Sequence, residues 1–157
     1  AAKAEDHPSC LIFSRQNLKF QARNEQQLND IKRGGYVISE AQGNAQAVII
    51  ATGSEVELAL EAQKTLAAQN IAVRVVSMPS TNVFDRQDAA YKAAVRPEGL
   101  PRVAVEAGHA DGWYKYVGLN GAVVGLNRFG ESAPAELLFK EFGFTVDNVV
   151  DTVKSVL

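Results

Sequence analysis

The chain has 157 residues, with 16 Lys and Arg against 18 Asp and Glu, so its net charge is −2 and its size suits one domain, with room for a short piece of another. Hydrophobic residues make up 46% and charged residues 22%, which excludes a disordered chain. The near-neutral charge argues against binding to nucleic acid or to anionic membranes. The single cysteine, Cys10, excludes an internal disulfide scaffold, and no apolar run reaches the ~18 residues that cross a bilayer. We therefore expect a soluble protein of the cytoplasm.

The first 33 residues predict one strand and one helix. Cys10–Ser14 is an apolar run that indicates a buried strand, and Glu25–Arg33 predicts a short helix with Leu28 and Ile31 facing inward. Gly34-Gly35 ends this helix and, with the polar residues before it, marks a boundary or linker. The chain does not begin with Met, as expected either of a protein that has lost it or of the end of a longer protein.

From residue 36 on, strands and helices alternate. The helices are expected at 55 to about 69, before Pro97, before Gly143 and at the C-terminus. Alternation of this kind predicts an α/β fold with three layers around a doubly wound, mostly parallel sheet. A tight turn joins the first two strands, so the first should lie antiparallel at the start of the sheet. The predicted strands are Tyr36–Ser39, Ala47–Ala51, Ala72–Met78, Arg102–Glu106 and Ala122–Val124.

Capping residues mark the helix ends. Ser54 followed by Glu57 matches a capping box, and Asn70 suits the C-terminus of the same helix. Asp85 and Asp88 are candidate caps for the helix before Pro97. Pro134 begins the next helix, and Thr145 caps the last one, in which Val146, Val149, Val150 and Val153 recur at helical spacing.

Doubly wound sheets bind ligands at the carboxyl ends of their strands. Thr52-Gly53-Ser54 lies there and could hold an anion with the amides of the following helix. It matches neither the dinucleotide nor the Walker phosphate pattern, so a strand-to-helix turn with a capping serine is favoured. The other strand-end segments are Pro79–Asn82, Glu106–His109 and Asn127–Gly130.

His109 and Asp111 are candidates for acid–base chemistry in one loop. Trp113, Tyr114 and Tyr116 follow them, and we favour a glycine-rich turn before an aromatic helix that packs on the core or on a partner. His7 is expected to be solvated. Two separated histidines and one cysteine give no zinc spacing.

Arg15 directly follows the first apolar run, where a guanidinium could bind a phosphate or carboxylate with two hydrogen bonds. From the residues alone, a surface arginine is the simpler interpretation.

Several motifs of the amino-acid sequence resemble those of the transketolases, and of bacterial transketolases in particular. The blocks that carry this likeness stand in family order from Ser9 onward. They are Ser14-Arg15-Gln16-Asn17-Leu18, Gly34-Gly35-Tyr36-Val37, Ile50-Ala51-Thr52-Gly53-Ser54-Glu55-Val56, Val76-Ser77-Met78-Pro79-Ser80-Thr81, Val105-Glu106-Ala107-Gly108, Gly130-Glu131-Ser132-Ala133-Pro134-Ala135-Glu136-Leu137-Leu138 and Phe142-Gly143-Phe144-Thr145.

This resemblance implies a thiamine diphosphate enzyme with magnesium or calcium that moves a two-carbon ketol unit between sugar phosphates of the pentose phosphate pathway. In the family, the arginine of the Ser-Arg-Gln motif contacts the sugar-phosphate substrate, so the resemblance gives that role to Arg15 and reverses the simpler interpretation. The chain has no Gly-Asp-Gly segment for the diphosphate and metal, no histidine-rich N-terminal site and no middle-domain glutamate. We therefore expect no cofactor, metal ligand or catalytic residue of its own, and no activity of the chain alone.

The resemblance also implies a division of the chain. Residues 1–33 would be the last strand of the middle, pyrimidine-binding domain plus a linker, and residues 34–157 the C-terminal domain of a homodimer, packed on the remaining transketolase domains. A non-catalytic α/β binding or assembly module and a subunit of a split transketolase are the alternatives. The coding region for Gly-Asp-Gly would distinguish these three interpretations. If it lies upstream in the same gene, the chain is an enzyme fragment, and if it lies in its own gene, the chain is a subunit of a split transketolase. A start codon just before Ala1 with no such companion would support the binding module.

Overall fold

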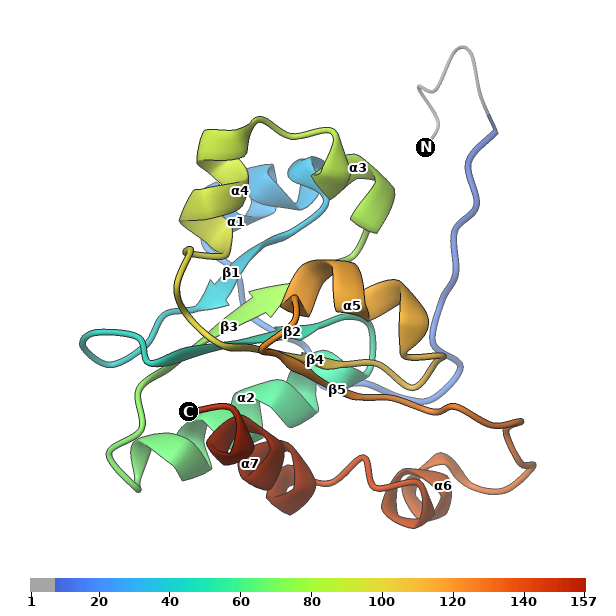
Figure 1. The fold of residues 1–157 in the computed structure, drawn as a ribbon. Coiled ribbons are helices and arrows are strands. Elements are labelled where there is room, and N and C mark those ends of the chain that lie inside the picture. The colour runs from blue at the N-terminus through green and yellow to red at the C-terminus, as the bar shows by residue number, and fades with distance from the viewer. Residues whose placement is uncertain (1–7) are drawn as a thin grey trace.

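The computed structural model describes residues 8–157, and five strands form its central sheet (Figure 1). Their order is β1-β3-β2-β4-β5, in which β1 is antiparallel to β3 and the other pairs are parallel. The sheet confirms the predicted doubly wound α/β fold with one antiparallel strand. The strands are β1 (Tyr36–Ser39), β2 (Ala47–Ala51), β3 (Val73–Ser77), β4 (Arg102–Val105) and β5 (Ala122–Val124).

Helices cover both faces of the sheet. One face carries α2 and α7, and α6 lies on the same side, whereas α1, α3, α4 and α5 lie on the other (Figure 1). The bounds are α1 (Glu25–Asp30), the 3-10 helix η1 (Ile31–Arg33), α2 (Glu55–Ala67), α3 (Thr81–Asp85), α4 (Ala89–Val95), α5 (Asp111–Val117), α6 (Ala135–Glu141) and α7 (Val146–Ser155). Among residues 8–157, no helix is both long and apolar enough to span a membrane.

The core has two halves because side chains alternate across the sheet. Ala47, Ile49 and Ala51 of β2 join the half under α2 and α7, and Val48 and Ile50 join the half under α4 and α5. All five residues of β2 are buried, as expected for a strand that is covered on both faces.

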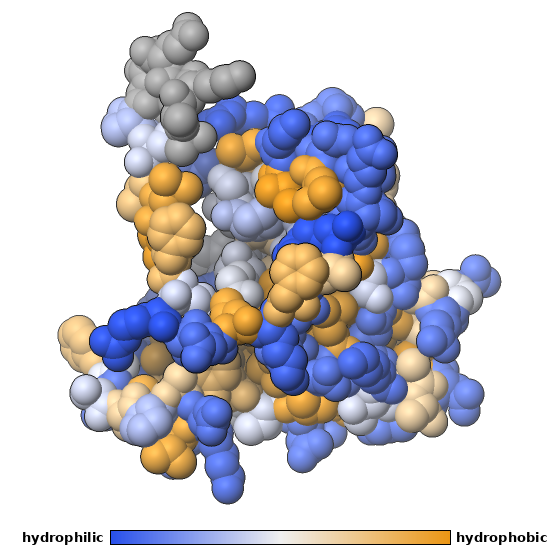
Figure 2. All heavy atoms as spheres, turned by 180° about the vertical axis from the view of Figure 1, so that it is seen from behind, coloured by the Kyte–Doolittle hydropathy of each residue, from blue (hydrophilic) through white to orange (hydrophobic). Residues whose placement is uncertain are grey.

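The prediction of a buried strand at Cys10–Ser14 is wrong for this chain. The segment is extended but belongs to no sheet, and Ile12 and Phe13 are 91% and 81% exposed. An apolar run becomes a strand only where another strand pairs with its backbone, and the part of the chain that is described provides none here. Its apolar side chains are exposed beneath the grey N-terminal residues (Figure 2).

The helix predicted at 25–33 is present, as α1 and η1, but Leu28 is exposed and so is part of Ile31. Gln27 gives α1 a role at the sheet edge, because its amide donates to the carbonyls of Val37 and Ile38 at 3.0 and 2.9 Å. These contacts cover carbonyl groups of the edge strand β1.

The expected place of β1 is correct only in part. It is antiparallel and lies at an edge, but its neighbour is β3, since Tyr36 pairs with Ser77 and Val37 with Val76. The turn at Gly43 therefore does not close a hairpin between β1 and β2, because β3 lies between them.

Two capping predictions are wrong. Ser54 makes no capping hydrogen bond, because its hydroxyl donates to Glu55 Oε1 at 2.9 Å, and Glu57 pairs instead with Lys19. Asp85 ends α3, a helix that the sequence analysis missed, and accepts from Lys115 Nζ at 2.7 Å.

The other caps are confirmed. Asp88 caps α4 through the Tyr91 amide at 2.8 Å, and Thr145 caps α7 through the Asn148 amide at 3.3 Å. Asn70 follows α2 with φ of 60°, the left-handed conformation that ends a helix.

Candidate functional site

Three loops at the carboxyl end of the sheet form the candidate site. They follow β2, β3 and β4, and β2 and β4 are neighbours in the sheet although β3 comes between them in the chain. In open α/β sheets, such a switch in strand order opens the crevice where ligands bind. The N-terminal segment passes over this crevice, and the two enclose a cavity of about 560 Å³ that we call the Arg15 cleft.

Arg15 lies on the N-terminal side of this cleft. The segment from Ile12 to Gln16 forms one wall, and the loops Thr52–Glu55 and Glu106-Ala107 form the opposite wall. The Arg15 side chain is exposed, so its guanidinium is accessible to an anion. The structure therefore places this predicted site residue at the edge of the sheet where α/β folds bind ligands.

Two acidic residues, whose roles sequence reasoning missed, form the floor of the Arg15 cleft. Glu55 is 3% exposed, and burial raises its pKa although the Ser54 hydroxyl and backbone amides of Glu55 and Ala107 donate to it. Burial, and then the charge of Glu55, raise the pKa of Glu106 to about 7. The signal that could have pointed to Glu106 is its place directly after the apolar strand β4, because an acidic residue there is surrounded mostly by apolar groups.

Thr52-Gly53-Ser54 is a strand-to-helix turn, as favoured, and is poorly suited to an anion. Gly53 takes φ of 55°, and the Glu55 amide donates to the Thr52 carbonyl at 3.1 Å. A bound anion would meet the buried carboxyl group of Glu55, which already lies at the start of α2.

A second cavity, of about 810 Å³, lies on the other side of Glu106 and is called the α5 cleft here. His109 lines it, and both His109 and Asp111 are exposed, with Nδ1 and Oδ2 3.5 Å apart. Trp113 and Tyr116 of α5 are buried in the core, which confirms the structural interpretation of this aromatic helix. His7 lies outside the described residues.

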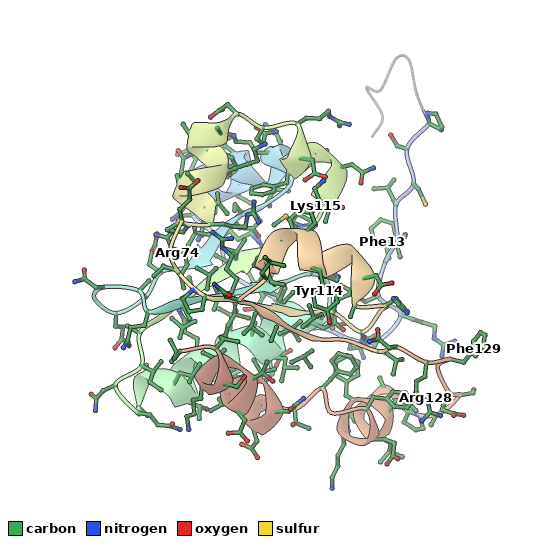
Figure 3. The ribbon with its side chains drawn as sticks, in the orientation of Figure 1. Phe13, Arg74, Tyr114, Lys115, Arg128 and Phe129 are labelled. Carbon is green, nitrogen blue, oxygen red and sulfur yellow. The ribbon has the colours of Figure 1, made fainter. Side chains whose placement is uncertain are left out.

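The loop after β5 takes no part in either cleft. Asn127 accepts from the Ala110 amide at 3.0 Å and so fixes the start of α5, whereas Phe129 is 96% exposed. Phe129 stands away from the body of the protein (Figure 3).

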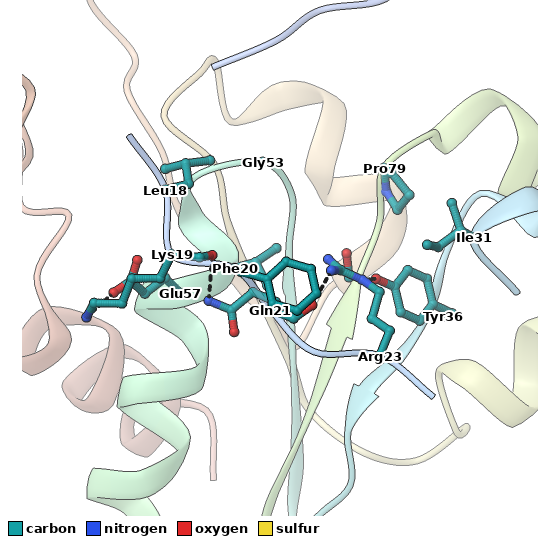
Figure 4. Close-up of a pocket in the computed structure, with 12 residues that line it drawn as sticks. Leu18, Lys19, Phe20, Gln21, Arg23, Ile31, Tyr36, Gly53, Glu57 and Pro79 are labelled. Atoms are coloured by element: carbon teal, nitrogen blue, oxygen red, sulfur yellow. Dashed lines mark hydrogen bonds and ion pairs between the residues drawn. The ribbon is translucent and has the colours of Figure 1, made fainter. Parts of the chain in front are cut away.

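A linker from Leu18 to Arg23 holds the N-terminal segment against the sheet. Figure 4 shows the cavity of about 380 Å³ beneath it. Arg23 donates to the Tyr36 hydroxyl and to the Gln21 carbonyl, both at 2.6 Å, and Lys19 pairs with Glu57 of α2. The chain that leads back to Arg15 is thus fixed at both β1 and α2.

No metal centre forms among residues 8–157, since no three His, Cys, Asp or Glu side chains there come close enough to hold an ion. Together with the acidic turn after β2, this means that the described residues do not fit a site for thiamine diphosphate and its metal.

Residues 34–145 match the family model described as the transketolase-like TK C-terminal domain. The chain belongs to this family. It is 62% identical over 154 residues to Transketolase 1 of Escherichia coli (strain K12), which covers 98% of this chain and 23% of that protein. The resemblance to transketolases is therefore confirmed, and the chain spans less than a quarter of the length of this curated relative.

Solved transketolases share the fold. The enzyme of Leishmania mexicana superimposes with a TM-score of 0.82 at 43% identity, over 90% of this chain and 20% of that one. A Pichia stipitis transketolase in complex with sedoheptulose-7-phosphate gives 0.75 at 42% identity, over 82% and 19%.

Proposed function

We propose that this chain is the C-terminal part of a transketolase, and that its contribution to ketol transfer between sugar phosphates is to bind the substrate phosphate through Arg15. The observation that carries this proposal is the exposed Arg15 at the mouth of a cleft at the carboxyl end of the sheet. A guanidinium forms two parallel hydrogen bonds to a phosphate and stays charged at any pH at which the protein is folded. The related Pichia stipitis enzyme is described with a sugar phosphate bound.

The reacting centre is proposed to lie in polypeptide outside this chain. Thiamine diphosphate with magnesium or calcium supplies an electron sink for the ketol carbanion. The described residues do not fit thiamine diphosphate and its metal, so we assign to this chain no step of the reaction on that cofactor. Its own residues bind the phosphate end of the substrate and hold the loop from which Arg15 reaches it. The expectation of a cytoplasmic enzyme of the pentose phosphate pathway stays a prediction.

Residues 1–33 are proposed to belong to the middle domain and its linker, and residues 34–157 to the C-terminal domain. Two observations support this division. The family match begins at residue 34, and the apolar side chains of Ile12 and Phe13 are exposed on a segment that pairs with no strand among residues 8–157. Burying each of them would gain about 1.5–3 kcal/mol, so we expect preceding transketolase domains, in a homodimer, to cover this segment.

Arg15→Ala in the full-length enzyme tests the proposal. A charge-assisted hydrogen bond contributes about 1.5–3 kcal/mol, so we expect the KM for a phosphorylated ketose to rise about tenfold to a hundredfold. The KM for the same ketose without its phosphate should stay unchanged. Arg128→Ala is the matched control, because Arg128 is an exposed arginine whose ion-pair partner is Glu131 at 2.8 Å, and its KM should change less than about twofold. An unchanged KM in Arg15→Ala would make Arg15 a structural residue.

A further inference from the structure

Glu106 lies between the two cavities at the carboxyl end of the sheet. It directly follows β4 and lines both the Arg15 cleft and the α5 cleft. Its Oε2 atom is buried and has no hydrogen-bond partner among the described residues. Its other oxygen, Oε1, is held beside Gly108, where a Cβ atom would stand 3.3 Å from it. A buried carboxylate oxygen without a donor is costly, so this group is built to receive one.

The side-chain donors that line the Arg15 cleft with Glu106 lie on the N-terminal segment and on the turn after β2. Ser14, Arg15 and Gln16 all line the Arg15 cleft together with Glu106, and each carries a side-chain donor. The Ser14 hydroxyl already lies over the turn after β2, 3.8 Å from the Cβ position of Gly53. Glu55 offers no donor when ionised, and its carboxyl group is occupied by the Ser54 hydroxyl.

We propose that Glu106 is a positioning residue for Arg15. In the full-length enzyme, where preceding domains are proposed to cover the N-terminal segment, its unpartnered carboxylate oxygen accepts a hydrogen bond from a side chain of residues 14–16 and so fixes the segment from which the guanidinium reaches a substrate phosphate. Glu106 itself touches no substrate. This inference rests on the proposed role of Arg15.

The contact depends on pH because only the ionised carboxylate is a strong acceptor. Six titratable or charged groups line the two cavities with Glu106, and they are Cys10 and Arg15 of the N-terminal segment, Glu55 of α2, Arg86 after α3, His109 after β4 and Tyr116 of α5. Burial, followed by the charge of Glu55, raises the pKa of Glu106 to about 7. The hydrogen bond between Glu106 and residues 14–16 therefore weakens as pH falls through about 7.

The experiment uses the full-length enzyme and two variants of Glu106. Glu106→Leu removes the acceptor, and we expect the KM for a phosphorylated ketose to rise about threefold to tenfold with kcat unchanged. Glu106→Gln keeps an acceptor oxygen, so its KM at neutral pH should stay within about twofold of the wild type. The wild-type KM should rise as pH falls from about 8 to about 6 more steeply than that of Glu106→Gln. The substrate phosphate also titrates in this range, since its second pKa is about 6. Its effect on KM is the same in both enzymes and cancels when they are compared.

A double-mutant cycle with Arg15→Ala separates positioning from a general effect on the fold. In the Arg15→Ala enzyme, Glu106→Leu should have no further effect on KM. If Arg15→Ala raises KM and Glu106→Leu does not, or if the two effects add, the positioning role is wrong while the role of Arg15 stands. If Arg15→Ala leaves KM unchanged, both proposals fail. If Glu106→Leu does not fold, the pH profile of Glu106→Gln decides, and a profile identical to the wild type overturns the inference.

Discussion

Gly34→Ala should destabilise the fold far more than an equivalent change at Gly43. Gly34 has φ of 85°, and a Cβ there would lie 2.4 Å from the Ser80 carbonyl oxygen and 2.5 Å from the Phe84 amide nitrogen. Both are backbone atoms at α3, and the Ser80 amide donates to the Gly34 carbonyl at 2.9 Å, so neither side can move freely. The new methyl group must therefore displace α3 or the end of η1.

The magnitude has two parts. The left-handed conformation costs an alanine about 1–2 kcal/mol, and forcing a methyl group into a packed site costs about 1–3 kcal/mol more. Gly43 is the matched control, since it has φ of 90° and nothing within 4 Å of its Cβ position. Gly43→Ala should therefore cost only the first part.

Urea denaturation of both variants, followed by circular dichroism, measures the difference. We expect the free energy of unfolding to fall by about 2–5 kcal/mol in Gly34→Ala and by about 1–2 kcal/mol in Gly43→Ala, with m-values unchanged. Total stabilities are about 5–15 kcal/mol, so the larger loss is readily measured. Equal losses in the two variants would refute the close approach of η1 and α3.

Two further predictions concern pH. Burial alone would raise the pKa of Asp85, but hydrogen bonds from Lys115 and Tyr116 outweigh burial and lower this pKa. Asp85→Asn should therefore reduce the free energy of unfolding at neutral pH. The difference between this variant and the wild type should vanish as pH falls through the lowered pKa. The pKa of Glu106 is raised to about 7, so the ionised residue destabilises the isolated chain, and Glu106→Gln should unfold at a higher temperature than wild type at about pH 8 but at the same temperature at about pH 4. Thermal unfolding from about pH 8 to about pH 2 checks both, because the lowered pKa of Asp85 lies at the acid end of this range, and a difference that is independent of pH would contradict them.

The sheet could be predicted because each of its strands carries its own signal. In β2, Ala47–Ala51 is apolar at every position, which only a strand covered on both faces requires. Thr145 and Asp88 were correct as caps because their hydrogen bonds are local and depend on nothing beyond the next three residues. Arg15 could be singled out only by family resemblance, since an arginine after an apolar run is common on protein surfaces.

Most of the failures share one cause, which is contact between residues far apart in sequence. Glu57 does not complete the capping box because it pairs with Lys19, although the Ser54 hydroxyl itself donates to its neighbour Glu55. Asp85 was misread because its partners, Lys115 and Tyr116, lie in α5. Cys10–Ser14 has the composition of a strand, but pairing is a property of two segments. Glu106 was missed as a functional residue because its unpartnered oxygen follows from the packing of α2, β4 and the N-terminal segment together.

Calorimetric titration of the 157-residue chain with thiamine diphosphate and magnesium tests the central claim most directly. We expect no binding heat, and no turnover of xylulose 5-phosphate and ribose 5-phosphate in the same solution, because the coenzyme site is proposed to lie in polypeptide outside this chain. Tight binding of the coenzyme by this chain alone would contradict it.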